Sequence, residues 1–507
     1  MNKKRCALLI FILTILSVFT VGCDKSKTQP VTKENQPDSS SPSVAFQFRR
    51  SKSEIKNLNT YDIVANLNAE NKTLNCSEKI KYANNSTSTF NEVYFHLYPN
   101  AYKTKETSPA LFGNEQNIYP QGFTPGSLDI SKLDINGKTT SYSIEGTDKT
   151  ILKVSLDKEL KPGEQITLDM NFNITIPTAT DRFGGYDGFF NFGNWYPIAA
   201  VYDDTGWNLD PYYKIGDPFY SDIASYNVKI DVPKDYIVAA SGEQVSESAK
   251  DNLKSYSFKE SNIRDFAWVA SNKFDVQENQ VDDINIKCYG IKESTEGNKA
   301  AMAAAESSIK TFNKVYGKYP YKNYSVVCTN FPSGMEYPKL VFISKQYCIS
   351  KNLRAVERVV VHETAHQWWY GIVGNDEIDE AWLDESFATY SESIFFENRD
   401  NSKDYYKYAA NGYNTVKGSL NDGAVLRPLS KFKGWDDYGP LAYNKGAVML
   451  NTLRDKIGDK TFFKVITTYY DRYKFKNAKT GDFKAVVEEI TKKNWDNFFQ
   501  KWLLDNN

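Results

Sequence analysis

Apolar and polar residues alternate with a period of two through much of the chain between residues 46 and 290. This period is typical of strands that bury one face. Asn136-Gly137, which lies between two alternating stretches, is the strongest short-range signal for a β-hairpin. No stretch of this half has a helical period. The sequence therefore predicts a mostly antiparallel β domain over 46–290, with its clearest strands at 61–68, 74–82, 93–98, 226–233 and 284–290.

A helical period begins at about residue 291 and dominates the second half of the chain. Apolar and small residues recur at helical spacing from Ala301 to Val315, and Gly317 and Pro320 follow as stop signals. At 507 residues the chain is long for one hydrophobic core, so a second domain over 291–507 is expected. Its predicted helices lie at 353–370, 382–397, 441–457, 459–473 and 480–492, after a short β segment that brackets PSGMEYP (332–338).

The first residues have the pattern of an export signal. Three basic residues precede an apolar run over 7–19 that is too short to span a bilayer. The run leads into FTVGC, which resembles a bacterial lipobox with Thr20 in place of the usual leucine. We therefore predict a lipoprotein signal peptide over 1–22, with Cys23 acylated and the protein anchored outside the bacterial cell membrane. An ordinary secretory signal cut nearby is the alternative.

The segment that follows has the composition of a tether. Residues 24–43 contain no large apolar side chain except Val31, so they bury too little surface to offset the entropy of ordering. A lipidated cysteine and a disordered linker over 23–45 would hold the folded part outside the membrane and close to it.

Charge and cysteine content argue against a nucleic-acid partner, a disulfide scaffold and a zinc–thiolate site. The formal net charge is −1 and no basic segment follows the first few residues, so no nucleic-acid partner is expected. The exported part has four thiols and no Cys-x-x-Cys pair, which argues against a disulfide scaffold and against zinc–thiolate chemistry. The sequence leaves open whether a disulfide bond forms among these four cysteines, which are Cys76, Cys288, Cys328 and Cys348.

The segment VVVHETAHQWWYG (359–371) holds two of the three histidines of the chain. On a helix His362 and His366 lie on one face, where both imidazoles can bind one zinc ion. Glu363 projects beside them and can take a proton from a metal-bound water. Gly371 is the expected end of this helix.

A catalytic zinc site also needs a third protein ligand. His96 lies in a predicted strand without a partner histidine, which favours a packed or surface imidazole. A carboxylate from EAWLDESFATYSE (380–392) is the better candidate. The apolar periodicity of this segment places Glu385 near the boundary of its buried face, but Asp384 and Glu380 compete with it on physical grounds.

The HETAH motif, eighteen further residues and Glu385 within WLDESFA resemble the zinc site of the gluzincin aminopeptidases, the aminopeptidase N, alanyl aminopeptidase and leukotriene hydrolase type. Asp384 replaces the usual asparagine. The resemblance implies one Zn²⁺ per chain, bound by His362, His366 and Glu385, with Glu363 as general base. It also implies a saddle-like N-terminal β domain followed by a thermolysin-like, mostly helical catalytic domain.

PSGMEYP is similar to the exopeptidase signature G-x-M-E-N of the same family. Gly334, Met335 and Glu336 are then implied as substrate-binding residues, because a fixed carboxylate can hold a charged α-amine. Tyr337 replaces the usual asparagine, and Ser333 replaces the usual first glycine.

Two further segments resemble the family. LAYNKGAVML (441–450) implies Tyr443 as the donor to the oxyanion, with Tyr438 as the second choice. FNFGNWYPIAAVYDD (190–204) lies where the family draws a substrate contact from the β domain. We expect a short form without the C-terminal helical domain of many members, and therefore a more open cleft.

These inferences predict a zinc-dependent aminopeptidase that hydrolyses the N-terminal residue from peptides with a free N-terminus. A thermolysin-like endopeptidase is the enzymatic alternative, and Glu336 argues against it. A non-catalytic surface lipoprotein that binds peptides is the alternative from another class.

Overall fold

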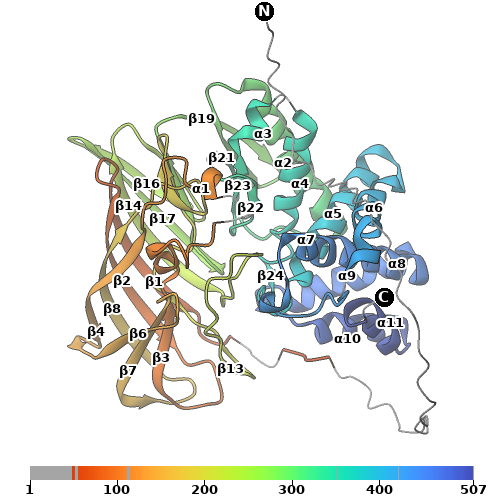
Figure 1. Cartoon of the computed structure of the whole chain (residues 1–507), viewed down its shortest axis with the longest axis horizontal. Helices are drawn as coiled ribbons and strands as arrows, with labels where there is room; N and C mark the ends of the chain where they lie inside the picture. The colour runs from red at the N-terminus through yellow and green to blue at the C-terminus, as the bar shows by residue number, and fades with distance from the viewer. Residues whose placement is uncertain (1–47, 52–54, 111–114, 351, 421, 506–507) are drawn as a thin grey trace, which may run out of the picture. The chain divides into compact units, whose positions relative to one another are not determined.

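The alternating strands of the first half assemble into antiparallel sheets (Figure 1). The structure is a computed structural model that describes residues 48–51, 55–110, 115–350, 352–420 and 422–505. The predicted signal peptide, Cys23 and all of the predicted linker lie outside these residues. The part from Phe46 to Asn507 forms one compact unit.

The largest sheet of the described residues has eight strands. Its neighbours are antiparallel except β1 and β14, which pair in parallel. In order across the sheet the strands are β16 (Glu243–Lys250), β17 (Leu253–Ile263), β14 (Ala224–Pro233), β1 (Asn59–Asn68), β2 (Thr73–Ala83), β8 (Gln165–Thr175), β4 (Ser127–Ile135) and β5 (Lys138–Thr139).

Two four-stranded sheets accompany the large sheet. One has the order β15 (Ile237–Ala240), β18 (Trp268–Ser271), β10 (Phe189–Phe192) and β9 (Phe183–Tyr186). The other has the order β11 (Ile198–Ala199), β3 (Phe90–His96), β7 (Ile151–Leu160) and β6 (Tyr142–Glu145). Strands β12 (Tyr202–Asp203) and β13 (Gly206–Trp207) form a small hairpin.

The hairpin predicted at Asn136-Gly137 is confirmed between β4 and β5. Both turn residues have positive φ, 50° and 80°, as a two-residue turn of the mirror-image type I requires. The expectation that this half has no helix is wrong in detail. A short 3₁₀ helix, η1 (Tyr98–Lys103), and a single turn, α1 (Glu115–Ile118), interrupt the strands.

A mixed five-stranded sheet links the two halves of the sequence. Its order is β19 (Phe274–Val281), β20 (Ile284–Ile291), β21 (Asn323–Thr329), β23 (Leu340–Ser344) and β22 (Gly334–Met335). The parallel pair of β20 and β21 crosses the boundary predicted at residue 290. The edge strand β22 belongs to the PSGMEYP segment, so the sheet carries part of the candidate site.

Helices make up most of the remaining chain, drawn in green to blue in Figure 1. Strands β24 (Val373–Gly374) and β25 (Lys476–Asn477) form a small parallel pair among them. The α-helices are α2 (Thr295–Val315), α3 (Lys345–Ile349), α4 (Leu353–Ala365), α5 (Trp382–Asp400), α6 (Lys407–Val416), α7 (Trp435–Tyr438), α8 (Gly446–Ile457), α9 (Asp459–Tyr473), α10 (Thr480–Thr491) and α11 (Asp496–Leu503). Short 3₁₀ turns are η3 (Lys403–Tyr406), η4 (Lys417–Ser419) and η5 (Leu429–Lys431), and η6 (Gly439–Lys445) is a π-helical turn. Among the described residues no helix is both long enough and apolar enough to cross a membrane.

The helix predicted over 353–370 begins as expected and ends early. The Asn352 side chain caps its start by accepting from the Ala355 amide, but the helix stops at Ala365 instead of near Gly371. The amides of residues 371–373 each donate to a carbonyl five residues back, and Tyr370 has a φ of 113°. The chain therefore leaves the helix directly after the second histidine of the motif.

The buried guanidinium of Arg264 holds this turn against the β half. Its Nε donates to the Tyr370 carbonyl at 2.7 Å, and one Nη donates to the Ser221 carbonyl at 3.0 Å. A second Nη donates to the Lys476 carbonyl at 2.7 Å. One arginine thus joins the segment after His366 to both the β half and β25.

Candidate active site

Helix α4 presents the two histidines of the HETAH motif on one face. His362 lies in its last turn and His366 is its C-cap residue. Their Nε2 atoms are 3.1 Å apart. Both imidazoles are shielded from solvent, His366 almost completely. The early end of the helix does not disturb the pair, because His366 keeps helical dihedral angles of −60° and −18°.

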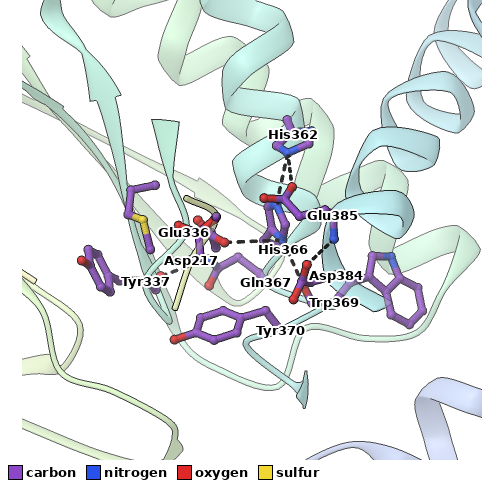
Figure 2. A network of polar contacts seen from close by, with 12 residues as sticks. Asp217, Glu336, Tyr337, His362, His366, Gln367, Trp369, Tyr370, Asp384 and Glu385 are labelled. Carbon is purple, nitrogen blue, oxygen red and sulfur yellow. Dashed lines mark hydrogen bonds and ion pairs between the residues drawn. The ribbon is translucent and has the colours of Figure 1, made fainter. Parts of the chain in front are cut away.

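Helix α5 brings Glu385 to the same point. Its Oε2 lies 3.3 Å from His362 Nε2 and 3.4 Å from His366 Nε2. Figure 2 shows this carboxylate between the two imidazole rings. The two competing carboxylates bind elsewhere. Asp384 accepts from the Asn375 side chain at 2.5 Å, and Glu380 accepts from the Thr480 amide at 2.6 Å.

The hydrogen bonds on the far side of the histidines fix which nitrogen faces the cluster. His362 Nδ1 lies 2.9 Å from Glu392 Oε1, and His366 Nδ1 lies 3.1 Å from the Trp369 carbonyl. A carboxylate and a carbonyl can only accept, so both Nδ1 atoms carry the proton. In the neutral form of each ring, Nε2 then presents its lone pair to the cluster that contains Glu385.

Two imidazole nitrogens and one carboxylate oxygen are electron-pair donors that fit a metal cation, which would displace any proton from the Nε2 atoms. Ligand atoms held 2.0–2.1 Å from a tetrahedral ion lie roughly 3.3 Å from one another. The observed separations among these three atoms are 3.1, 3.3 and 3.4 Å. The donor set of two imidazoles and one carboxylate is typical of a catalytic zinc site with an open position.

The charge around the cluster also favours a cation. Burial alone would lower the pKa of His362, but hydrogen bonds to Glu385 and Glu392 raise it to about 10. The pKa of His366 is likewise raised to about 10, against burial, mainly by Glu336 and Glu385. The same pairing lowers the pKa of Glu385 although burial opposes it. The pocket therefore concentrates negative charge that an ion would balance.

Glu363 lies beside the cluster and is nearly completely buried. Burial, and after it the charge of Glu336, raises the pKa of its carboxyl well above the usual range. The carboxylate packs directly against the backbone of Gly334, where any Cβ atom would meet it. Strand β22 therefore fixes the position of the expected general base.

Glu336 follows β22 and points toward His366 (Figure 2). Its Oε1 lies 4.0 Å from His366 Nδ1 and has no hydrogen-bond partner among the described residues. One carboxylate oxygen each from Asp217, Glu336 and Glu385 lies within 4.8 Å of the others. A buried carboxylate with an unused oxygen beside the histidine–glutamate cluster is a candidate recognition site for a positively charged group.

Met335 connects this strand to the β half. Its Sδ accepts from Arg182 Nε at 3.1 Å, and the Arg182 guanidinium forms a buried ion pair with Asp217. Among the described β-half residues, Asp217 is therefore the carboxylate that reaches the site. The predicted segment 190–204 reaches it indirectly, since Asn194 accepts from the Tyr337 hydroxyl at 3.1 Å.

Tyr443 lies on η6, a π-helical turn at the start of the predicted helix 441–457. Its hydroxyl donates to Glu385 Oε1, and its ring stacks on His362 with the ring centres 5.9 Å apart. Tyr438 packs edge-on against Tyr443 at 5.8 Å. The structure thus places Tyr443 in direct contact with the cluster and Tyr438 behind it.

His96 takes no part in this site. Its ring stacks on Tyr98 with centres 4.8 Å apart, and its Nε2 lies 3.2 Å from the Asn208 carbonyl. Burial lowers the pKa of the imidazole to about 4, which keeps it neutral. The prediction of a packed imidazole is confirmed.

Sequence reasoning missed two carboxylates of the site. Glu392 lies on α5 two turns after Glu385, and a search of that helix face for a partner of His362 would have found it. Arg358, one turn before His362, binds Glu392 through Nε at 2.6 Å. Asp217 had no such local signal, because it comes from a distant loop of the β half.

Residues 300–502 match the model of the Peptidase family M1 domain. This segment contains the two histidines, Glu363, Glu385, Glu336 and Tyr443. The second half of the chain is therefore similar to the domain of this peptidase family.

Several curated proteins share sequence with this chain. Aminopeptidase M1 of Arabidopsis thaliana is 26% identical over 291 residues, which are 52% of this chain and 32% of that protein. Aminopeptidase N of Streptomyces lividans is 29% identical over 199 residues, 36% of this chain and 23% of that protein. Endoplasmic reticulum aminopeptidase 2 of Homo sapiens is 35% identical over 134 residues, 25% of this chain and 14% of that protein. The match covers a third or less of the length of these three relatives, from 32% for the first to 14% for the last.

Solved structures match over nearly the whole chain. An M1 zinc metallopeptidase from Deinococcus radiodurans has a TM-score of 0.66 at 18% identity, covering 91% of this chain and 96% of that one. A mutant of the enzyme bound to a Tyr-Ser-Ala substrate has a TM-score of 0.65 at 18% identity, covering 89% and 94%. These likenesses confirm the predicted fold, a β-sheet domain followed by a largely helical catalytic region.

Proposed function

We propose that this protein is a zinc-dependent aminopeptidase that removes the N-terminal residue from peptides. The observation that carries the proposal is the placement of Glu336 and Asp217 beside the His362–His366–Glu385 cluster. An aminopeptidase must bind a charged α-amine next to the scissile bond, and two buried carboxylates provide the charge to do so. The M1 domain match and the names of the relatives point to the same activity.

Each residue then has a defined task. His362, His366 and Glu385 would hold one zinc ion, which supplies Lewis acidity and lowers the pKa of a water when bound. Glu363 takes the proton of the attacking water and later delivers it to the leaving amine. Tyr443 donates its hydroxyl proton in a hydrogen bond to the carbonyl oxygen on which negative charge develops. Glu336 and Asp217 hold the ammonium group and so select the first peptide bond.

The resemblance to a complex with Tyr-Ser-Ala supports a peptide as the substrate class. The test is hydrolysis of amino-acid arylamides, with N-acetylated arylamides and internally quenched blocked peptides as comparison substrates. Activity on free-amine substrates that a chelator abolishes and one equivalent of Zn²⁺ restores would support the proposal. Cleavage of blocked peptides alone would identify an endopeptidase, and absence of both zinc and turnover would identify a peptide-binding protein.

A Glu336→Gln variant gives a sharper test of amine recognition. It removes the charge and keeps the shape, so we expect KM for free-amine arylamides to rise by at least tenfold while the zinc content stays constant. Glu296→Gln is the matched control, because Glu296 lies in the first turn of α2 and pairs with the exposed Lys299. Equal KM values for both variants would assign amine binding to another group.

We further propose that the protein is exported and anchored through Cys23. Support comes from the basic start, the apolar run over 7–19 and the FTVGC sequence. Metabolic labelling with palmitate and fractionation of the cells test this, with Cys23→Ser as the control. Unlabelled wild-type protein in the medium would instead indicate an ordinary secretory signal.

A further inference from the structure

Two buried cysteines lie in contact behind the candidate substrate strand. Cys328 is in β21 and Cys348 is in α3, and their Sγ atoms are 2.9 Å apart. Both side chains are closed off from solvent. This separation is shorter than ordinary contact between two sulfur atoms that share neither a bond nor a proton. The two thiols therefore need only a small movement to become bonded.

The other two described thiols have different surroundings. Cys288 donates weakly to the Asn298 carbonyl at 3.7 Å. Cys76 lies in β2, in the large sheet of the β half. They are also buried, so they serve as internal controls for any effect of burial on the oxidation or labelling of a thiol.

The contact closes a ring of chain around the substrate-binding segment. After Cys328 the chain passes through Gly334, Met335 and Glu336 and then through β23. Cys328 pairs in register with Ile343 of β23, and α3 then carries Cys348 back to Cys328. The next element is α4, which holds both metal-site histidines. A bond between the two sulfurs would therefore join the sheet directly to α3, the short helix that precedes α4.

We propose that Cys328 and Cys348 form a disulfide bond in the exported protein, and that this bond holds the Glu336 segment in place. The proposal rests on the export inferred above, because disulfides form in oxidising compartments and are rare in the cytosol. It concerns a modification of the fold and does not depend on the peptidase chemistry.

The oxidant is a disulfide, that of a thiol–disulfide oxidoreductase in the cell or oxidised glutathione in the test tube. One cysteine thiolate attacks a sulfur of the oxidant and forms a mixed disulfide, releasing the first thiol of the oxidant. The second cysteine thiolate then displaces the remaining oxidant thiol. Two protein thiols lose two electrons and two protons, and the disulfide of the oxidant becomes two thiols.

In the folded protein one of the two thiols donates to the other. The thiolate form is the nucleophile in the exchange, so either cysteine can attack the oxidant, and the other then completes the bond. Since both sulfurs are buried in the folded protein, the exchange takes place before α3 has packed onto β21.

Closing this ring limits the freedom of the unfolded chain and so stabilises the folded one. In the native state the bond would hold β22 and β23 to α3. Reduction should therefore lower the Tm and loosen Glu336 against His366. The loosening predicts a higher KM for free-amine substrates with a smaller change in kcat.

The decisive measurement is the redox state of the individual cysteines in the full-length protein. Exported protein is trapped with N-ethylmaleimide in denaturant without reductant, digested and analysed by mass spectrometry. We expect the Cys328 and Cys348 peptides joined, lighter by two hydrogen atoms than their sum, while Cys76 and Cys288 carry the label. Labelling of all four cysteines would overturn the proposal.

A second measurement tests whether the two sulfurs can bond at all, independently of the compartment in which the protein resides. Reduced, purified full-length protein is refolded with oxidised glutathione, and wild type is compared with Cys328→Ser and Cys288→Ser. Wild type and Cys288→Ser should lose two thiols and gain on the order of a few degrees in Tm, which TCEP reverses. Cys328→Ser should show neither change. A pair that stays reduced in this buffer would show that the two sulfurs do not bond, wherever the protein resides.

Discussion

The Nδ1 atom of His362 lies 2.9 Å from Oε1 of Glu392. Glu392 is held in turn by Arg358, so a charged chain runs from the helix surface to the metal-site imidazole. The carboxylate fixes the tautomer and the orientation of the ring, and it raises the basicity of the nitrogen that faces the cluster.

Glu392→Gln should therefore weaken zinc binding by about 10–100-fold without changing any ligand. Chelator competition followed by zinc analysis measures the affinity. Glu397→Gln is the matched control, because Glu397 lies on the same helix and binds Arg454 at 2.6 and 2.8 Å away from the site. Equal zinc affinity in the two variants would show that Glu392 does not contribute to zinc binding.

Glu363→Gln removes the proton acceptor and leaves the three metal-site side chains untouched. We expect kcat on an amino-acid arylamide to fall by about 10²–10⁴-fold, the usual range for loss of a general base. The zinc content should equal that of wild type. A variant that keeps zinc and full activity would disprove the proposed proton transfer.

Tyr443→Phe removes a hydroxyl that reaches the cluster through Glu385. We expect kcat to fall by about 10²–10³-fold, as for loss of one donor to an oxyanion, with little change in KM. Tyr438→Phe is the comparison, since this second tyrosine packs behind the first. A larger loss in Tyr438→Phe than in Tyr443→Phe would reverse the assignment of the donor.

Gly334→Ala tests the contact between β22 and the general base. The added Cβ would fall on the Glu363 carboxylate and displace it. We expect kcat to fall while zinc binding and Tm stay close to wild type, because the three atoms nearest to the added Cβ all belong to Glu363. Gly418→Ala is the control, since nothing lies within 4 Å of its added Cβ. Unchanged kcat in Gly334→Ala would mean that Glu363 can act from a shifted position.

His96 should make stability depend on pH. Its folded pKa is about 4, below the ordinary value of 6.5, because burial disfavours the charged ring. The stabilisation is complete above pH 6.5 and is lost as pH falls toward the folded value. Between pH 7.5 and 5 the free energy of unfolding should drop by about 2 kcal/mol from this group.

Denaturant unfolding of wild type and His96→Gln at both pH values measures this contribution. Because every other titrating group is common to both proteins, the drop in wild type should exceed the drop in the variant by about 2 kcal/mol. Parallel losses in the two proteins would show that the imidazole is not buried as a neutral group.

The strands and the helix spacing of the HETAH motif could be predicted from the sequence because they depend on local patterns. The alternation of apolar and polar residues predicted which face of β1 is buried. Asn136-Gly137 predicted one turn, since both residues adopt positive φ. The four-residue spacing of His362 and His366 requires only a helix to bring the imidazoles together. Physical reasoning from the sequence could not decide which residue is the third zinc ligand, Glu385, Asp384 or Glu380. Only the family resemblance favoured Glu385.

The end of α4 could not be predicted in this way. The sequence placed it at Gly371, but the structure places it at Ala365, and the Arg264 guanidinium from the β half binds the Tyr370 carbonyl in the turn that follows. Glycine is one means of ending a helix, and a tertiary hydrogen bond to the backbone is another that leaves no local pattern.

The partners of the metal-site residues likewise depend on the fold. By itself the sequence determined the elements, the histidine pair and the residue types that zinc chemistry needs. Only the tertiary structure decided that Glu392 orients His362, that Asp217 joins Glu336 beside the cluster, and that Cys348 lies against Cys328. Periodicity and residue spacing predict the structure of a single element. These contacts instead join segments that are distant in sequence and meet only when whole elements pack, so no local pattern predicts them.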